Sequence, residues 1–380
     1  MRALHKVAVN LRWLPAYLAQ QRFSGSDLTV QRHLIIALAD HFEPCYSGVP
    51  EVFNPVSEQV RRVREWASRY PATTDDFRDA DGHPFKHTYF YPAEHNHPEV
   101  LSTLAEHCRQ GWGEIEVHLH HGINQPDTSA NTRETLESFL DTLAQLGALS
   151  RTNGGQNRQY AFVHGNWALA NYGNGKYCGV DDEMQILSET GCYADFTMPA
   201  APGPLQIAGK VNSIYECGRP LNQRAPHRRG RNLRAGQTPE KYPILVQGPL
   251  MLDFRADRLM PRIENAELSE KNPATLRRLN LWRRAGIIVQ GRPEWCFIKL
   301  HCHGMAPSDF PAMLGAAKSD FLRQLTELSK QTGEFDLHFV SAREMINMIL
   351  AACDGHSGNP GKFRDYKYRL ISTSQQVEAE

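Results

Sequence analysis

Three features are missing from this sequence of 380 residues: a paired-cysteine motif, an excess of charge of one sign, and a long uninterrupted apolar run. Its eight cysteines are scattered, so we expect reduced thiols in a cytoplasmic protein and no disulfide framework. Lys plus Arg and Asp plus Glu both number 42. Because nucleic-acid-binding proteins carry a basic surplus, this balance argues against nucleic acid as the main partner.

The first twenty residues do not form an uninterrupted apolar stretch, because Arg2, Lys6 and Arg12 interrupt it. This segment is therefore neither a clear signal peptide nor a membrane-spanning helix. We expect a terminal helix that packs against the core, with peripheral contact to a membrane surface as the alternative. A transmembrane segment is not expected.

No glycine-rich turn follows the first predicted strand, which weakens a dinucleotide-binding interpretation. What the sequence does contain is an alternation of strand-like and helix-like runs, typical of an α/β fold. We predict strands at residues 34–38, 87–91, 115–118, 160–163, 193–197, 244–247, 297–300 and 337–340. We predict helices at 56–70, from Pro98, and from about 182 to 191, and two more that begin at the capping boxes Asn131/Glu134 and Ser341/Glu344.

These elements predict a distorted (β/α) barrel of about seven or eight mostly parallel strands, with a doubly wound open sheet as the alternative. Residues 1–355 are expected to form one domain that begins with the N-terminal helix. The polar and basic stretch at about 205–242 is interpreted as an insertion. Residues 356–380 lose periodicity, and we expect them to form a frayed tail.

Polar side chains of the kinds that bind metals follow several of the predicted strands. They are Asp40, His41 and Glu43; His118, His120 and His121; His164, Asn166 and Trp167; Asp195; and His301 and His303. Because the carboxyl ends of barrel strands converge, we expect these segments to share one site. Imidazoles with one carboxylate are a common catalytic zinc set, so a divalent metal, Zn²⁺ first, is the expected cofactor. Alternatively, the histidines hydrogen-bond loop backbones around an empty pocket.

Several segments resemble the polysaccharide deacetylases, the family of chitooligosaccharide and peptidoglycan deacetylases. The similar segments are Ala37-Leu38-Ala39-Asp40-His41-Phe42, His87-Thr88-Tyr89-Phe90-Tyr91, Gly113-Glu114-Ile115-Glu116-Val117-His118, Gly191-Cys192-Tyr193-Ala194-Asp195-Phe196-Thr197 and Lys299-Leu300-His301. The resemblance spans about residues 34–340 and implies a barrel of the glycoside hydrolase/deacetylase type. It implies that Asp40 is the metal-binding acid, His118 the first metal-binding histidine, and His301 the late histidine that acts as general acid.

The sequence departs from the family pattern at three places. Ala39 stands where the family has its catalytic base, and Gly122 stands where it has its second metal-binding histidine. The family's Arg-x-Pro-Tyr motif is replaced by residues 162–167, Phe-Val-His-Gly-Asn-Trp. His120 or His121 is then the substitute metal ligand, and Glu43, His41 or His303 the substitute base.

The resulting hypothesis is a metal-dependent hydrolase that removes N-acetyl or O-acyl groups from a carbohydrate. Asp40, His118 and His121 or His120 hold the ion, Glu43 or His41 is the base, and His301 or His303 protonates the leaving amine. His164, Asn166, Trp167 and Asp195 are the expected substrate-binding residues, with Trp167, Trp295 and Tyr193 as candidates for stacking on sugar rings. The basic stretch 224–231 either binds an anionic or lipid-linked glycan or is a solvated loop.

Two other functions remain open at this point. The pairs His118/His120 and His301/His303 also suit a metallohydrolase of the amidohydrolase or phosphoesterase type. The absence of an acid at Ala39 suits a catalytically degenerate barrel that binds glycan or scaffolds polysaccharide synthesis.

Overall fold

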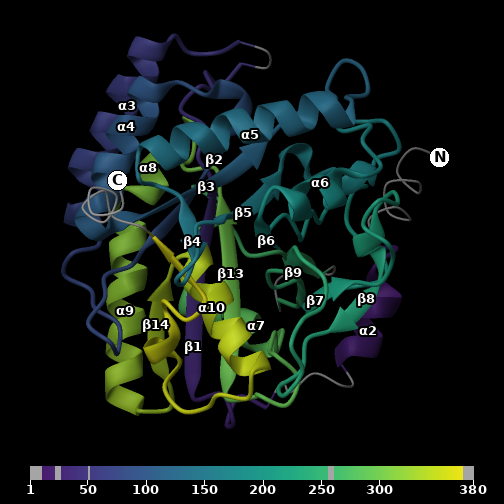
Figure 1. Cartoon of the computed structure of the whole chain (residues 1–380). Helices are drawn as coiled ribbons and strands as arrows, with labels where there is room; N and C mark the ends of the chain where they lie inside the picture. Colours follow the sequence, from purple (N-terminus) through teal and green to yellow (C-terminus); the bar gives the residue numbers. More distant parts are fainter. Residues whose placement is uncertain (1–10, 22–26, 50–51, 256–260, 371–380) are drawn as a thin grey trace.

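The computed structural model describes residues 11–21, 27–49, 52–255 and 261–370, and shows a mixed α/β protein built on one large, mostly parallel sheet (Figure 1). The helices are α2 (Leu14–Gln21), α3 (Val56–Arg69), α4 (Pro98–His107), α5 (Ser129–Gln145), α6 (Glu183–Glu189), α7 (Leu276–Arg284), α8 (Phe310–Met313), α9 (Ala316–Thr332) and α10 (Ala342–Cys353). The parallel strands are β1 (His33–His41), β2 (His87–Pro92), β3 (Gly113–Leu119), β5 (Arg158–His164), β6 (Cys192–Asp195), β9 (Ile244–Val246), β12 (Glu267–Leu268), β13 (Trp295–Cys302) and β14 (Asp336–Val340).

The strands wind around the sheet in chain order. The order is β13-β1-β2-β3-β5-β6-β9, every neighbouring pair in this series is parallel, and β13 returns to pair with β1. β14 pairs with the first half of β1, where β2 has not yet joined it. The prediction of mostly parallel strands is confirmed.

The two ends of this series, β9 and β13, share no hydrogen-bonded pair in the described part of the chain. A Cβ atom on Gly248, just after β9, would lie only 2.5 Å from the carbonyl oxygen of Lys299 in β13. The Lys299 amine donates to the carbonyl oxygens of Phe196 and Met198, at 2.7 and 2.6 Å. Lys299 of β13 therefore packs against the segments that follow β6 and β9, which brings the two ends of the series close together.

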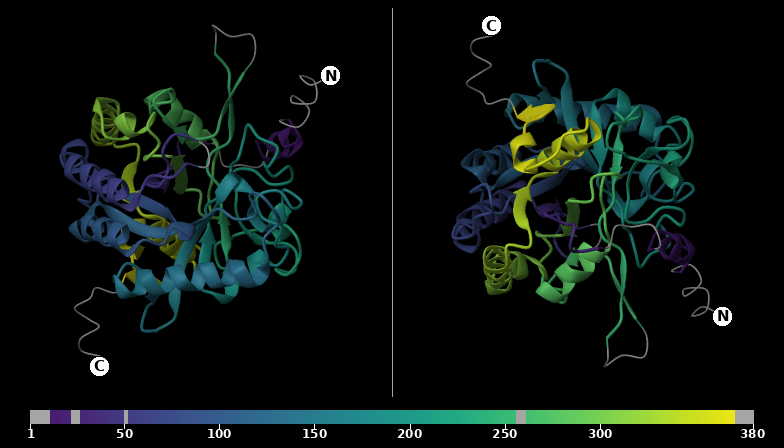
Figure 2. Two further views of the ribbon diagram at one scale, coloured as in Figure 1. Left: turned by 90° about the horizontal axis from the view of Figure 1, so that it is seen from above. Right: turned by 90° about the horizontal axis from the view of Figure 1, so that it is seen from below.

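Antiparallel strands extend this sheet at its margins. They are β4 (Ser150–Thr152), β7 (Ile214–Cys217), β8 (Gly230–Asn232) and β15 (Tyr368–Leu370). The expected irregular insertion at 205–242 thus contains two strands, of which β7 pairs with both β8 and β9. A separate hairpin, β10 (Met251–Asp253) and β11 (Arg262–Glu264), extends away from the body (Figure 2).

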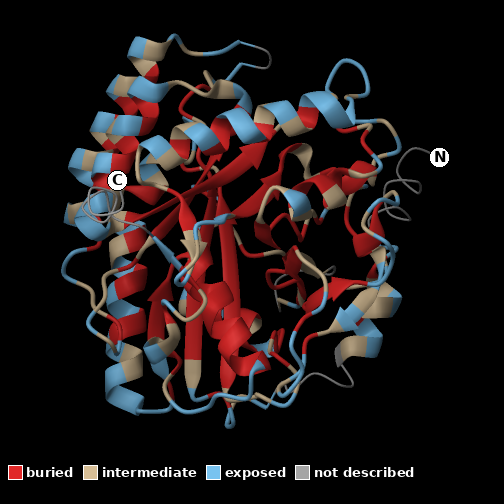
Figure 3. Cartoon of the chain, in the orientation of Figure 1, coloured by how far each residue is buried: buried red, intermediate tan, exposed pale blue. Residues whose placement is uncertain are grey.

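Alternate side chains of each central strand belong to two different cores. Leu34, Ile36 and Leu38 of β1 join the core that also contains Trp66 of α3 and Leu101 of α4. The residues between them, Ile35, Ala37 and Ala39, join a second core on the opposite face of the sheet, here called the inner core. It also contains Phe90 and Val163. Because successive strand residues point to opposite faces, the strands are buried on both sides (Figure 3).

Of the two predicted capping boxes, one is confirmed and one is wrong. Ser341 caps α10, and the side chain of Glu344 in turn accepts from the Ser341 backbone N–H. α5, in contrast, begins at Ser129, because the Thr128 side chain already accepts from the backbone N–H of Asn131. The helix thus starts earlier than the Asn131/Glu134 pattern predicts.

The predicted tail after residue 355 is wrong as far as residue 370. A 3₁₀ turn covers Pro360–Phe363, and β15 pairs with β4. Arg364 is buried and hydrogen-bonds Asp79 at 2.7 Å. Residues 371–380 lie outside the described part of the chain.

At the other end of the chain, α2 packs as a terminal helix. Trp13 and Tyr17 are buried in the inner core with Met251, whereas residues 1–10 lie outside the described residues. No helix in the described part of the chain has both the length and the apolar character that crossing a membrane requires. All eight cysteines are free thiols, as predicted.

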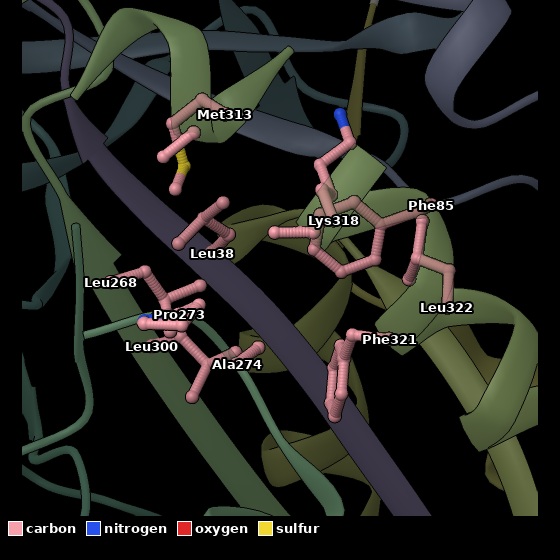
Figure 4. Close-up of a pocket in the computed structure, with 12 residues that line it drawn as sticks. Leu38, Phe85, Leu268, Pro273, Ala274, Leu300, Met313, Lys318, Phe321 and Leu322 are labelled. Atoms are coloured by element: carbon pink, nitrogen blue, oxygen red, sulfur yellow. The ribbon is translucent and has the colours of Figure 1, made fainter. Parts of the chain in front are cut away.

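A small hollow lies between the outer face of β1 and β13 and helices α8 and α9 (Figure 4). Its walls are apolar, and Lys318 is its one charged lining residue. The Lys318 amine lies 3.9 Å from the centre of the Tyr70 ring, and burial lowers its pKa to about 7. None of the predicted site residues lines this hollow, so it is not the candidate site.

Arg343, at the start of α10, connects three parts of the molecule. Its guanidinium donates to both carboxylate oxygens of Glu114 in β3, at 3.0 and 2.8 Å, and to the carbonyl of Tyr368 at 2.9 Å. Both side chains of the Arg343–Glu114 pair are only 5% exposed.

We predict that Arg343→Met lowers the free energy of unfolding by about 3–5 kcal/mol, because it leaves the Glu114 carboxylate buried without its partner. Chemical denaturation measures this loss. The matched control is Arg61→Met, which removes an exposed ion pair with Glu58 and is expected to change stability little. Equal effects of the two substitutions would contradict the assignment of Arg343 as a structural connector.

Candidate functional site

The structure divides the predicted site residues among three places rather than one. The first is the mouth cluster, defined here as His41, Glu43, Glu94, His118, His120, Trp167 and His303. The second contains Asp40, with His87 and Cys302. The third, here called the buried quartet, is His121, His164, Cys178 and Glu183.

The centre of the mouth cluster is formed by His41, Glu43 and His118, whose ligand atoms all lie within 4.8 Å of one another. His41 ends β1 and His118 lies near the end of β3, so both strands deliver an imidazole to the same end of the sheet. His118 Nδ1 donates to the carbonyl oxygen of Val163 at 2.7 Å. This bond leaves Nε2 facing Glu43 Oε1 at 3.0 Å.

Electrostatics in this centre favour neutral imidazoles beside an ionised carboxylate. Burial lowers the pKa of His118, and burial together with neighbouring His303 holds the pKa of His41 well below its usual range. Burial acts to raise the pKa of Glu43, but its interactions with the His118 and His120 side chains outweigh this and hold that pKa well below the usual range. Two neutral imidazoles and one carboxylate are the donor set of a known class of catalytic zinc sites, so these residues fit a divalent ion.

Glu94 is a member of the mouth cluster that the sequence analysis did not identify. His120 Nδ1 lies 2.7 Å from Glu94 Oε1, and His120 Nε2 lies 3.3 Å from Glu43 Oε1. Burial acts to lower the pKa of His120, but the two carboxylates raise it to about 10. Glu94 comes just after β2, as the predicted site residues come at or just after the ends of other strands. This position after a strand is the feature of the sequence that could have identified Glu94.

A cleft of about 320 Å³ opens beside the mouth cluster. His301, His303 and Trp167 line one part of it, and Asn265, Glu267 and the proline-rich segment 199–205 line the rest. The His303 ring lies 4.6 Å from the His41 ring and 6.1 Å from the Trp167 ring, measured between centroids. The cleft therefore leads directly to the predicted histidines.

Two further predicted residues lie near the cleft without lining it. Asn166 shares a turn with Trp167 in which both backbones are left-handed, with φ of 52° and 55°. Asp195 is buried below the cleft, where it accepts from the Thr197 hydroxyl at 2.7 Å, and burial raises its pKa to about 7. Its contacts are therefore internal.

Asp40 does not join His118, so the predicted ligand set of Asp40, His118 and His121 is not formed. Asp40 accepts from the backbone N–H of Gly304 at 2.7 Å, and its other oxygen lies 3.4 Å from His87 Nε2. The physical reason is the alternation along β1: His41 points into the mouth, so its neighbour Asp40 points to the helix-covered face.

The same alternation displaces His164. Val163 belongs to the inner core, whereas His164 follows Phe162 on the outer face and meets His121 in the buried quartet. His164 is fully buried and does not line the cleft, contrary to its predicted substrate-binding role. Trp295 and Tyr193 are also buried, so neither is available to stack on a sugar ring.

Comparisons with known proteins add little to this geometry. Neither a protein-family model nor a curated protein matches the chain. Among solved structures, an α-mannosidase from Enterococcus faecalis V583 aligns with 84% of this chain at 9% sequence identity and a TM-score of 0.36. The aligned part covers 29% of that protein, so the chain spans less than a third of its length. A likeness of this size establishes neither a shared fold nor a shared activity.

We predict that His118→Ala lowers the metal content of the purified protein by one equivalent, because it removes a central donor of the mouth cluster. Asp40→Asn is the matched control and is expected to retain the wild-type content, since Asp40 lies in a different group. Elemental analysis after dialysis provides the measurement. Wild-type content in His118→Ala would remove the mouth cluster as a metal site.

Proposed function

We propose that this chain is a metal-dependent hydrolase that removes acyl groups from a carbohydrate, on a distorted (β/α) barrel of the glycoside hydrolase/deacetylase type. The observation that carries the proposal is the convergence of His41, Glu43 and His118 beside an open cleft at the carboxyl ends of parallel strands. This is where barrel enzymes place their active sites. The contact between Gly248 and Lys299 supports the barrel.

His41, Glu43 and His118 would hold the ion, and zinc suits this donor set best. When bound, such an ion supplies Lewis acidity toward a carbonyl oxygen and lowers the pKa of a bound water. The sequence predicts Glu43 or His41 as the base, but the position of both side chains in the donor set favours a role as metal ligands. The hydrogen bond from His118 to Val163 orients that imidazole and fixes its tautomer.

Proton transfer then falls to the histidines that line the cleft. His303 is partly exposed there and adjoins His41, which places it to receive or deliver a proton at the reacting group. His301 Nδ1 has no hydrogen-bond partner among the described residues, although the side chain is buried and lines the cleft. Because an unpaired buried nitrogen is costly, a substrate group is its natural partner.

The shape of the cleft favours a ring-shaped, amphipathic substrate. Trp167, Pro199, Pro202 and Pro204 are among the residues that line it. Flat apolar surfaces of this kind suit the C–H faces of a sugar, while Asn265 and Glu267 can hydrogen-bond its hydroxyl groups. The resemblance to polysaccharide deacetylases supports an acyl group as the part that is removed.

The departure at Ala39 gives the inactive, glycan-binding alternative its best support. Ala39 is packed in the inner core and carries no acid at the position of the family's base. The mouth cluster contains other proton carriers, His303 and the pair of His120 with Glu94. We therefore favour an active enzyme with a rearranged site.

The direct test is acetate release from N-acetylated and O-acetylated oligosaccharides by the zinc-loaded protein. We expect release that stops on chelation, returns with zinc, and is absent in His118→Ala. Phosphate esters assayed in parallel test the phosphoesterase alternative. Oligosaccharide binding with no acetate release, unchanged by chelation, would contradict the proposal and favour the binding protein.

We predict that His303→Ala lowers kcat for acetate release by about 10²–10⁴-fold, the usual contribution of a general acid or base. Its metal content should stay at the wild-type level, because His303 is not among the three central donors. Ser308→Ala, an exposed change nearby, is the control. An unchanged kcat in His303→Ala would exclude the proton-transfer role.

A further inference from the structure

The buried quartet brings four metal-binding side chain types together from separate parts of the chain. His121 follows β3, His164 ends β5, Cys178 lies in the following loop, and Glu183 is the first residue of α6. All four side chains are buried, and their ligand atoms all lie within 4.8 Å of one another. None of them lines the cleft.

Both imidazoles of the quartet direct the same nitrogen inward. His121 Nδ1 lies 2.8 Å from Asp127 Oδ2, and His164 Nδ1 donates to the carbonyl oxygen of Gly165 at 2.5 Å. With both Nδ1 atoms engaged as donors, each neutral ring presents a bare lone pair at Nε2. These two Nε2 atoms lie only 2.9 Å apart.

The Glu183 carboxylate faces both of these Nε2 atoms. Its Oε1 lies 2.8 Å from His121 Nε2 and 3.1 Å from His164 Nε2. Lone pairs this close repel one another unless a proton or a metal ion lies between them.

Cys178 distinguishes a metal ion from a shared proton between these lone pairs. Its Sγ lies 3.7 Å from Glu183 Oε2. A buried cysteine beside two imidazoles and a carboxylate has the composition of a closed tetrahedral zinc site.

The spacing of the donors agrees with that geometry. Zinc–nitrogen bonds of about 2.0–2.1 Å in a tetrahedron place neighbouring donor atoms roughly 3.3 Å apart. The separations among the nitrogen and oxygen donors here are 2.8–3.1 Å, so they need to move by only a few tenths of an ångström. The bond from Asp127 to His121 supplies the carboxylate that orients zinc-bound histidines.

The backbone around the quartet is close-packed and strained. A Cβ atom on Gly122, whose φ is 64°, would lie 2.0 Å from the Cys178 carbonyl oxygen. The segment from 166 to 177 contains several residues other than glycine with positive φ: Asn166, Trp167, Ala170, Asn171, Asn174 and Tyr177. Backbone strain of this kind persists only where the surroundings fix it.

We propose that His121, His164, Cys178 and Glu183 hold a structural zinc ion, which fixes the strained 165–178 loop and so sets the position of Trp167 at the cleft. This site is separate from the mouth cluster and does not depend on the hydrolase proposal. With four protein donors and no exposed face, it has no open coordination position for water or substrate.

Cobalt substitution separates this site from the mouth cluster, because of these two sites only the quartet contains a cysteine. The metal-free protein is loaded with Co²⁺, and the near-ultraviolet charge-transfer band of cobalt thiolate is recorded. We expect the band in the wild type and in His118→Ala, and its loss in Cys178→Ser. The matched control, Cys217→Ser, changes another buried cysteine outside the quartet and should retain the band.

Lack of the band in the cobalt-treated wild type, or its survival in Cys178→Ser, would overturn the proposal. Loss of the band in Cys217→Ser would also overturn it, by placing the thiolate elsewhere. Should Cys178→Ser not fold, Asp127→Asn is the second variant, because it keeps all four donors and removes only the group that orients His121. It is expected to bind Co²⁺ about 10–100-fold more weakly, with the band retained at saturation, and unchanged affinity would contradict the assignment.

Discussion

The alternation of side chains along the parallel strands determines which polar groups can meet in this protein. Asp40 and His41 are adjacent in sequence, yet one faces the helix layer and the other faces the opposite side of the sheet. Val163 and His164 separate in the same way. A row of histidines and acids that looks like one site in the sequence is thereby divided among three locations, each with its own charge balance.

Two of these locations have opposite characters. The mouth cluster contains carboxylates and imidazoles beside an open cleft, an arrangement suited to chemistry on a bound molecule. The buried quartet has a similar donor set with no access to the cleft, an arrangement suited to holding loops together. The third location contains Asp40 and His87 on the helix-covered face of β1. There Asp40 accepts from the backbone N–H of Gly304. Similar residue types therefore serve different purposes according to burial.

The sequence was sufficient for the main elements of the fold, because apolar runs and helical periodicity depend on local patterns. It placed the first strand at 34–38 within β1 and the last helix at the Ser341 cap of α10. It was not sufficient for facing direction, since a shift of one residue reverses the face of a side chain. Cys178 and Glu183 could not be predicted, because no local pattern joins them to His121 and His164, which lie far away in the chain.

The side chain of Lys299 connects β13 to the segment that follows β6. Its amine is bonded to the carbonyls of Phe196 and Met198, and the Met198 carbonyl also accepts from the backbone N–H of Gly248, just after β9. The cleft is lined by segment 199–205, which begins directly after Met198, and by His301 at the end of β13. One buried amine therefore anchors the point of the chain from which this wall of the cleft starts.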